Sequence, residues 1–237
     1  MIEISRLHKS YGNRQVLKNI DLRFEKGGIT GIAGPNACGK STLIKCILGT
    51  AVPNRGEIAI NGKPIDSKGE FRGDLGYMPQ NPNFPENMNS TELLDMFESL
   101  RNTRSNLRDE LMEYFGLNQI AKQPIGEFSG GTKQKLAAVI AFMFDPPIIV
   151  LDEPTASLDP LASSKFKHMV LRKADEGKTI VMVSHFISEL EKLAKRIVFL
   201  NDGELVYSGA LSELYTQTGA SDLDSSLHRL FERHPSL

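Results

Sequence analysis

The residues best suited to chemistry form a loop between a short apolar run and a stretch with helical periodicity. The apolar run 29–33 leads into a loop bounded by glycines, and Lys40 and Ser41 then open the helical pattern. Backbone N–H groups of a tight loop and of a helix N-terminus can converge on a polyphosphate, and the helix dipole adds partial positive charge. Lys40 would reach the β- and γ-phosphates, and the Ser41 hydroxyl would complete the coordination of Mg²⁺. The residues expected to bind the phosphates are Gly34, Pro35, Asn36, Ala37, Cys38, Gly39, Lys40, Ser41 and Thr42.

Two residues of this phosphate loop (residues 34–39) carry further expectations. Ala37 stands where many such loops have glycine, so a positive φ at this position would cost about 1 kcal/mol or more. The thiol of Cys38 is expected to line the phosphate pocket, where a bulky thiol reagent would block ligand binding.

A second candidate group is a pair of carboxylates at the end of another strand. Asp152 and Glu153 end the apolar run 148–151, a buried strand that is expected to lie beside the strand of the phosphate loop. One acid could coordinate Mg²⁺, and the other could orient or deprotonate an attacking water. Acidic pairs at strand ends are common, so it is the presence of the phosphate loop that favours a function for this pair.

A third candidate is the turn Ser129, Gly130 and Gly131, at the start of a predicted helix. Glycine lowers helix propensity, and two of them here would be explained by a phosphate that approaches the backbone under the helix dipole. An ordinary serine N-cap is the alternative, and the residues taken alone slightly favour it.

Composition limits the classes of protein to which the chain can belong. It has 237 residues, 40% of them hydrophobic, a net charge of −1 and a pI near 6.5, which disfavours electrostatic binding to nucleic acid or to an anionic membrane.

Its two cysteines, Cys38 and Cys46, lie on one short segment and do not form a disulfide framework, which indicates a reducing cytosol. The N-terminus reads as an alternating strand and not as a signal peptide. The longest apolar region, 136–151, is broken by Asp145 and two prolines, so any membrane role needs a partner chain.

The hydrophobic pattern predicts an open α/β sheet that holds these groups, because strands alternate with helices and the first crossover is glycine-rich. Residues 82–145 read as a helical insert between two strands, with Ser90 as the N-cap of its first helix. The predicted domains are 1–210, including this insert, and a C-terminal helical extension at 211–237. The expected elements are strands at 2–9, 20–24, 29–33, 57–60, 75–78, 148–151 and 179–183, a hairpin over 198–207, and helices at 40–48, 130–144 and 223–231.

Over residues 1 to about 210 the chain resembles the nucleotide-binding subunit of an ABC transporter. The motifs that carry the resemblance stand in the order of that family: Tyr11 as the aromatic that stacks on adenine, 34–41 as the Walker A loop, Gln80 as the Q-loop glutamine, 128–132 as the signature motif, 148–152 as Walker B, Glu153 as the catalytic carboxylate, 157–159 as the D-loop and His185 as the switch histidine. The signature motif separates this family from other P-loop ATPases. The departures from the family pattern are Ala37, Phe128 in place of leucine and Thr132 in place of glutamine.

The resemblance implies an α/β P-loop NTPase of the ABC type, with a mixed core sheet, an antiparallel β subdomain and an inserted helical subdomain. It implies ATP as the substrate and Mg²⁺ held by Ser41, Gln80 and Asp152. Two subunits would face head to tail, so that the signature residues of one chain reach the γ-phosphate bound by the other. The residues that the resemblance assigns to the nucleotide from this second side are Ser129, Gly130, Gly131 and Asp159, and those that it assigns to catalysis are Glu153, His185 and Gln80.

The resemblance further implies a homodimer that drives a separate transmembrane permease subunit. The chain would be cytoplasmic, peripheral on the cytoplasmic face of the inner membrane, and in contact with the membrane only through that partner. An apolar groove beside residues 81–95, with Phe84, Met88 and Leu93, would receive a short helix of the partner. The alternative is a soluble ABC-type ATPase that acts as an assembly or scaffold factor.

The subfamily is suggested by the segment 80–87, the signature motif and the compact length. These features are similar to exporter-type subunits, and most similar to those of copper-processing systems that mature nitrous oxide reductase. Cys38 and Cys46 lack nearby histidines and would make a poor copper site, so ordinary packing is expected for both.

Overall fold

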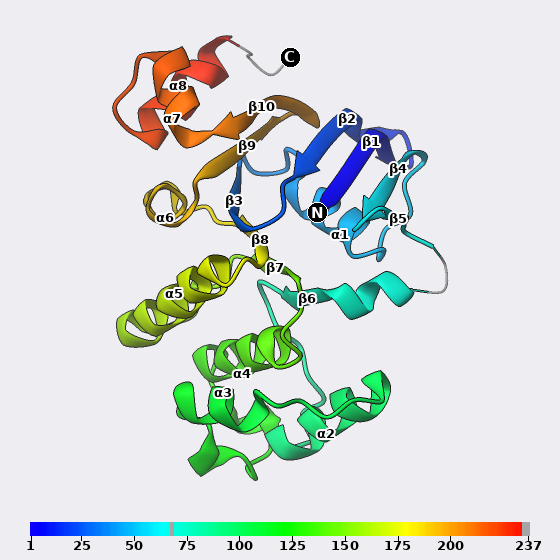
Figure 1. Cartoon of the computed structure of the whole chain (residues 1–237), viewed down its shortest axis with the longest axis vertical. Helices are drawn as coiled ribbons and strands as arrows, with labels where there is room; N and C mark the ends of the chain where they lie inside the picture. The colour runs from blue at the N-terminus through cyan, green and yellow to red at the C-terminus, as the bar shows by residue number, and fades with distance from the viewer. Residues whose placement is uncertain (67–68, 234–237) are drawn as a thin grey trace.

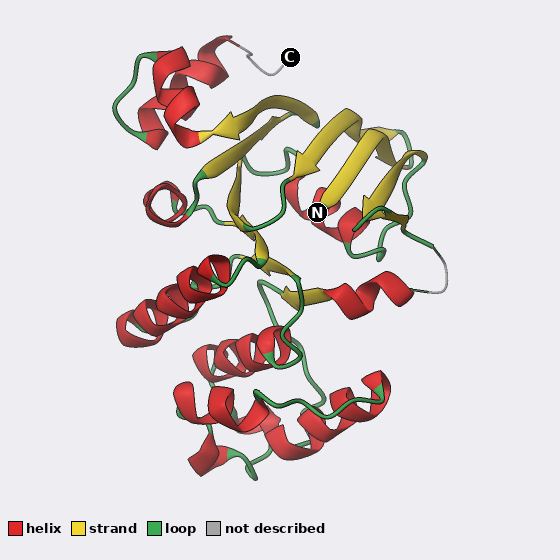
Figure 2. Ribbon diagram, in the orientation of Figure 1, coloured by secondary structure: helices red, strands yellow, loops and turns green. Residues whose placement is uncertain are grey.

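The computed structural model describes residues 1–66 and 69–233, which form two β-sheets with helices packed around them (Figure 1, Figure 2). The strands are β1 (Ile2–Tyr11), β2 (Arg14–Phe24), β3 (Gly28–Ala33), β4 (Arg55–Ile60), β5 (Lys63–Pro64), β6 (Leu75–Met78), β7 (Ile148–Asp152), β8 (Thr179–Val183), β9 (Arg196–Asn201) and β10 (Glu204–Ala210). The α-helices are α1 (Lys40–Ile47), α2 (Ser90–Arg101), α3 (Arg108–Tyr114), α4 (Gly130–Phe142), α5 (Pro160–Asp175), α6 (Ile187–Leu193), α7 (Leu211–Thr218) and α8 (Leu223–Arg233), and 3₁₀ turns lie at Glu70–Asp74, Asn118–Ile120 and Ile125–Glu127.

The two sheets differ in strand direction. The smaller sheet has the order β2-β1-β4-β5 and is antiparallel. The larger sheet has the order β10-β9-β3-β8-β7-β6, and all its neighbours are parallel except β9 and β10. This arrangement confirms the expected mixed core sheet with an antiparallel subdomain.

One expectation about the core sheet was wrong. The strand that ends in Asp152 does not lie beside the strand of the phosphate loop, because β8 pairs with β3 on one side and with β7 on the other. The three strands are all short, apolar and almost fully buried, so their sequences give no indication of which one lies in the middle. The phosphate loop and the acidic pair are therefore separated by the width of one strand.

The core sheet is the middle of three layers, and alternate residues along its strands face opposite ways. Ile148, Val150 and Val181 face a cluster formed with α1 and the antiparallel sheet. Ile149 and Leu151 face the other cluster, which contains the buried sides of α4, α5 and α6. Both faces are thus covered, as a parallel sheet requires.

Helices α2, α3 and α4 gather at one end of the molecule, away from the antiparallel sheet (Figure 1). They lie between β6 and β7 in the chain, where the sequence predicts the helical insert. The predicted N-cap of α2 is one residue off. Asn89 is the cap, since its side chain accepts the Glu92 N–H at 3.0 Å while the Glu92 carboxylate accepts the Asn89 N–H at 2.9 Å. Ser90 is instead the first helical residue, and its hydroxyl is buried without a hydrogen bond among the described residues.

The C-terminal helices α7 and α8 pack on each other, and α8 also packs on α6. The predicted apolar face of the tail is confirmed at Leu223, Leu227 and Leu230, which are buried, whereas Phe231 is 39% exposed. The last four residues of the predicted extension lie outside the described residues. Within the part of the chain that the structure describes, none of the helices has both the length and the apolar character to cross a membrane.

Candidate active site

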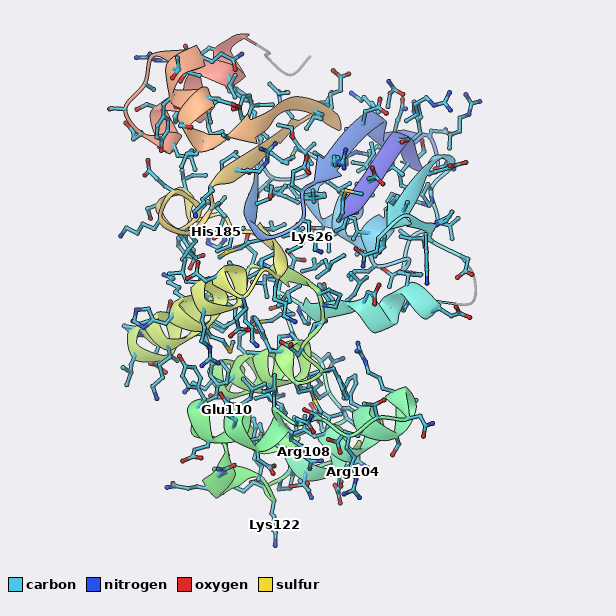
Figure 3. All side chains as sticks on the ribbon, viewed as in Figure 1. Lys26, Arg104, Arg108, Glu110, Lys122 and His185 are labelled. Atoms are coloured by element: carbon cyan, nitrogen blue, oxygen red, sulfur yellow. The ribbon has the colours of Figure 1, made fainter. Side chains whose placement is uncertain are left out.

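A hollow of about 690 Å³ lies where the phosphate loop, the end of the first hairpin and the carboxyl ends of β6, β7 and β8 meet. Figure 3 shows His185, from the loop after β8, near the middle of the molecule and far from Lys122 at the end of the helical insert. The residues that line the hollow are Tyr11, Arg14, Val16, Asn36, Ala37, Gly39, Lys40, Ser41, Thr42, Gln80, Asp152, Glu153, Val183 and His185.

The phosphate loop is shaped by positive φ angles at both ends. Gly34 has φ 151° and Gly39 has φ 111°, and a Cβ on Gly34 would lie 2.2 Å from the carbonyl oxygen of Leu200. Only glycine fits there, because of both the backbone conformation and the space. Ala37 has φ 63°, so the expected strain at this position is present.

Lys40 stands at the start of α1 and lies over the inside of the loop. Its ammonium donates to the carbonyl oxygens of Gly34 and Pro35, both at 2.8 Å. The first-turn amides of α1 have no intrahelical acceptor, and none of the described side chains caps them. Cation and free amides therefore face one small volume, which is an arrangement suited to a polyphosphate.

The expectation that the Cys38 thiol lines the pocket was wrong. Cys38 is 3% exposed and belongs to the apolar cluster between the two sheets, and its Sγ would lie 2.7 Å from a Cβ on Gly34. Burial raises the pKa of the Cys38 thiol, although the charge of Lys40 opposes this. The residue contributes its backbone to the loop, and its side chain anchors the loop to the core.

Two carboxylates stand side by side at the end of β7. Asp152 is 9% and Glu153 8% exposed, and Glu153 has a positive φ of 50°. Burial first, and the charge of Glu153 second, raise the pKa of the Asp152 carboxyl. A divalent cation would relieve this repulsion. Carboxylate, hydroxyl and amide oxygens are the hard donors that Mg²⁺ prefers, so the set Asp152, Ser41 and Gln80 fits this ion.

The structure pairs Glu153 with His185 across two loops. The Glu153 Oε2 lies 2.6 Å from His185 Nδ1 and accepts the backbone N–H of His185 at 3.1 Å. The backbone N–H of Glu153 in turn donates to the carbonyl of Val183 at 2.9 Å. A carboxylate and an imidazole in this contact can share a proton at the edge of the hollow.

The hairpin of β1 and β2 forms the wall of the hollow next to its opening. Tyr11 is 49% exposed at the rim of the hollow. Arg14 and Val16 line the same wall and were not predicted. Arg14 is the register partner of Tyr11 across the two-residue turn and begins β2, whereas the sequence predicts this strand only from residue 20, which left Arg14 and Val16 outside it.

The turn Ser129, Gly130 and Gly131, called the signature turn here, lies outside the hollow of the same chain. Ser129 Oγ accepts the N–H of Thr132 at 3.2 Å and caps α4, which is the ordinary role considered as the alternative. A Cβ on Gly131 would lie 2.7 Å from the carbonyl oxygen of Ser157, so close packing within the chain explains this glycine. Gly130 has no heavy atom of the described chain within 4 Å of such a Cβ. Its glycine character is therefore unexplained within one chain.

Asp159, the other residue assigned to the second side of the nucleotide, also lies outside the hollow. Its carboxylate accepts the N–H of Ala162 at 2.8 Å and caps α5. The hydrogen bond to Ala162 lowers the pKa of this carboxyl.

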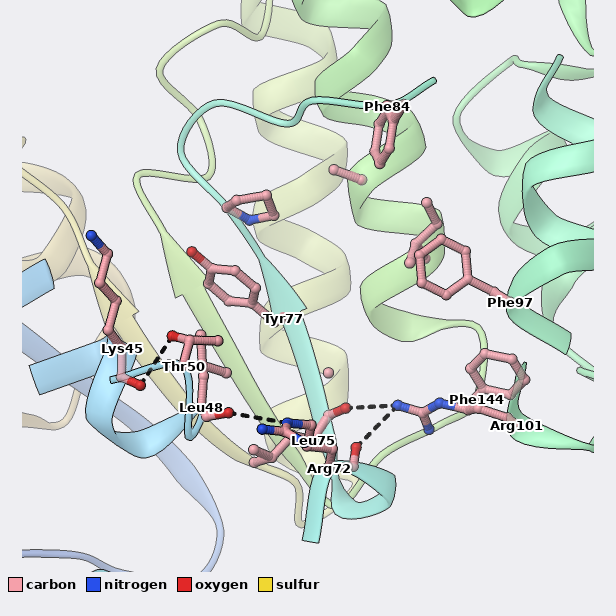
Figure 4. A pocket seen from close by; sticks show the side chains of 14 residues that line it. Lys45, Leu48, Thr50, Arg72, Leu75, Tyr77, Phe84, Phe97, Arg101 and Phe144 are labelled. Carbon is pink, nitrogen blue, oxygen red and sulfur yellow. Dashed lines mark hydrogen bonds between the residues drawn. The ribbon is translucent and has the colours of Figure 1, made fainter. Parts of the chain in front are cut away.

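A separate apolar groove of about 460 Å³ lies between α1, β6, α2 and α4 (Figure 4). Phe84 lines it as expected, together with Tyr77, Phe97 and Phe144. Met88 and Leu93 do not line it, because Leu93 is fully buried in the core of the helical insert and Met88 packs against that core. The groove exists beside the predicted segment, but mostly other residues form it.

Comparisons with known proteins agree with this geometry. The family model described as "ABC transporter" matches residues 17–156. The chain is 32% identical to the lantibiotic transport ATP-binding protein SrtF of Streptococcus pyogenes, over 91% of this chain and 96% of that protein. It is 33% identical to the Nod factor export ATP-binding protein I of Burkholderia orbicola, over 88% of this chain and 70% of that protein.

Solved structures give the same result. The fold matches the structure of an ATP-binding subunit of an ABC transporter with a TM-score of 0.92 and 28% identity, over 97% of this chain and 99% of that one. It matches a dimeric ATP-binding cassette in a post-hydrolysis state, bound to ADP and Pi, with a TM-score of 0.80 and 28% identity, over 89% and 99% of the two chains.

Proposed function

This chain belongs to the ABC transporter family of ATP-binding subunits, and from that premise we propose that two copies enclose two ATP molecules and transmit their hydrolysis to a separate transmembrane subunit. The observation that carries the proposal is the division of the site. Each chain has a hollow with Lys40, Glu153 and His185, and its signature turn lies elsewhere with an exposed Gly130 face. A second copy, placed head to tail, would bring that face to the hollow.

The residues of the hollow divide the work between binding and chemistry. The ammonium of Lys40 and the first-turn amides of α1 bind the β- and γ-phosphates, while the ring of Tyr11 stacks on the base. Ser41, Asp152 and Gln80 would hold Mg²⁺, which when bound neutralises phosphate charge. ATP is the ligand of the family, and the residue roles and the metal are part of this proposal.

The chemical step depends on Glu153 and His185. The Glu153 carboxylate accepts a proton from the attacking water, and its contact with His185 Nδ1 keeps the carboxylate at the edge of the hollow. His185 also lines the hollow, and we infer that its ring donates to the γ-phosphate. The first-turn amides of α1 hold the phosphates of the departing ADP in place during the transfer.

The apolar groove supports docking of the transmembrane partner. It is lined by aromatic side chains, and two arginines tie its floor together (Figure 4). Arg101 donates to the Leu75 carbonyl at 2.9 Å, and Arg72 donates to the Leu48 carbonyl at 3.4 Å. The groove thus joins α2 of the insert to the C-terminal end of α1, whose other end binds phosphate. A helix docked here would contact both.

The shared site can be tested by dilution. We expect ATPase activity per molecule to fall as the protein is diluted below the dissociation constant of the dimer, because each chain holds only half of the site. Activity per molecule that stays constant over that range would refute the shared site. Mixing Lys40→Ala protein with Ser129→Arg protein offers a second measurement, since only a mixed dimer contains one intact pair of halves.

The transmembrane partner can be tested separately. We expect Phe84→Glu to retain ATPase activity in the isolated protein and to lose co-purification with a multi-span membrane protein. Wild-type protein that purifies from membranes without such a partner would favour the soluble scaffold ATPase. In the transporter case the chain works at the cytoplasmic membrane face and reaches the membrane only through its partner. The resemblance to copper-processing subunits stays a prediction, which the identity of that partner would test.

A further inference from the structure

A buried acid lies directly behind the Glu153–His185 pair, and the function proposed above does not use it. Glu189 is the third residue of α6 and is 5% exposed. A buried carboxylate is costly unless its oxygens are hydrogen-bonded or paired. Both oxygens of Glu189 have partners, and the partners come from three different segments of the chain.

The first oxygen holds the loop that carries His185. Ser184 Oγ donates to Glu189 Oε2 at 2.8 Å, and the same Oγ accepts the backbone N–H of Phe186 at 3.1 Å. These two hydrogen bonds fix Ser184 and Phe186, the chain neighbours of His185 on either side. The turn that presents the imidazole is therefore tied to α6 from behind.

The second oxygen holds the loop that carries Glu153. Thr155 Oγ1 donates to Glu189 Oε1 at 2.9 Å, and Thr155 follows Glu153 by two residues. Lys167 of α5 lies 3.1 Å from the same oxygen and supplies the opposite charge. The carboxylate of Glu189 thus links the loop after β7, the loop after β8 and helix α5.

This link meets a specific need of the site. Glu153 and His185 follow different strands, and their 2.6 Å contact requires the two loops to keep a fixed relative position. Glu153 also has a φ of 50°, a conformation that the surrounding structure must hold in place. The hydrogen bond from the Glu153 backbone N–H to the Val183 carbonyl fixes one point of the loop after β7. The hydrogen bond from Thr155 to Glu189 fixes a second point, two residues further along the chain.

We propose that Glu189 is a positioning residue for ATP hydrolysis, whose carboxylate joins Thr155 to Ser184 and so holds Glu153 against His185. The proposal rests on the ATPase function proposed for this site and adds a residue to it. Glu189 touches neither the nucleotide nor the attacking water. Its effect passes through the two loops that it connects.

The test compares variants that weaken the link between Thr155, Glu189 and Ser184 with one that keeps both hydroxyl contacts. Glu189→Gln keeps the size of the side chain but lets only one of its two terminal atoms accept, and Thr155→Val removes the hydroxyl on the Glu153 side. Lys167→Met is the matched control, because it removes the ion pair and keeps both hydroxyl contacts. For each variant we would measure kcat, KM for ATP, equilibrium ATP binding and the melting temperature.

We expect Glu189→Gln and Thr155→Val to lower kcat by about 10- to 100-fold, with KM and ATP affinity within about twofold of wild type. Lys167→Met should keep kcat within about twofold, even if its melting temperature falls. The proposal is overturned if kcat follows the melting temperature in all three variants, or if Thr155→Val and Glu189→Gln turn over like wild type. Because Thr155 is only partly buried, Thr155→Val decides the matter if Glu189→Gln does not fold.

A second readout does not depend on turnover. The imidazole resonances of His185 in the nucleotide-free protein report its contact with Glu153, so we expect them to move in Glu189→Gln and Thr155→Val and not in Lys167→Met. Unmoved resonances in the first two variants would refute the positioning role. A wild-type chain without ATPase activity would refute the proposed function, and the resonances would still show whether Glu189 holds the pair.

Discussion

Two adjacent glycines at the start of α4 allow the shared site to be tested against simple helix packing. Alanine at Gly131 would place its Cβ 2.7 Å from the carbonyl oxygen of Ser157, whereas alanine at Gly130 would meet no heavy atom of the described chain within 4 Å. The two substitutions add the same methyl group to neighbouring residues. Their effects should nevertheless be opposite.

The expected magnitudes follow from these distances. A contact of 2.7 Å with a backbone oxygen forces the backbone to shift, and such overpacking costs about 1–3 kcal/mol. Gly131→Ala should therefore lower the melting temperature of the nucleotide-free protein by about 2–12 °C. Gly130→Ala should leave it unchanged or raise it by up to about 4 °C, because alanine favours a helix by up to about 1 kcal/mol over glycine.

The ATPase activity of Gly130→Ala should fall although its stability does not. In the proposed dimer the γ-phosphate of the partner approaches the Gly130 amide, so a methyl group there holds the phosphate away from its donors. We expect ATPase activity of Gly130→Ala to fall by at least about 10-fold at a protein concentration where wild type is dimeric. The assays are thermal unfolding without nucleotide and steady-state ATP hydrolysis.

Either of two results would refute the reasoning. Wild-type turnover by the folded Gly130→Ala protein would mean that no phosphate approaches this face. A Gly131→Ala protein as stable as wild type would mean that the Ser157 carbonyl does not constrain the helix start.

Three further predictions follow from the site and its surroundings. Glu153→Gln should keep ATP binding, lower turnover by about 10²–10⁴-fold through loss of the proton acceptor, and accumulate a nucleotide-bound dimer in size-exclusion chromatography; full turnover would remove Glu153 from its role. Both thiols should react slowly with a thiol reagent in the native protein and fast in urea, since burial raises the pKa of Cys38 and raises that of Cys46 to about 11; rapid native labelling of Cys38 that ATP prevents would place its thiol in the pocket after all. Asp152→Asn should raise the melting temperature of the nucleotide-free protein by about 2–4 °C near neutral pH. Burial and the charge of Glu153 raise the pKa of the Asp152 carboxyl, so its ionisation disfavours the folded state, and the gain from the asparagine should vanish below the ordinary carboxyl pKa of 3.8. A melting temperature below that of wild type at pH 7 would contradict this.

Groups that act through neighbouring residues could be predicted from the sequence. The phosphate loop is one of them, since its glycines, Lys40 and the first turn of α1 are contiguous. The cap of α5 by Asp159 is likewise a contact across three residues. The cap of α2 was missed by one residue although the capping box of Asn89 and Glu92 is a local pattern.

Groups that depend on packing between distant segments were decided only by the tertiary structure. Strand β8 lies between β3 and β7, and no local feature distinguishes one buried apolar strand from another. The inward turn of Cys38 depends on the cluster between the two sheets, and the contact between Glu153 and His185 joins residues 32 positions apart. Glu189 can bond to both Thr155 and Ser184 only because the fold brings the loops after β7 and β8 side by side. Hydrogen bonds and backbone conformations that involve neighbouring residues depend on the local sequence, which can be read directly. Strand order and side-chain direction depend on how the whole chain buries its apolar surface, which no local segment determines.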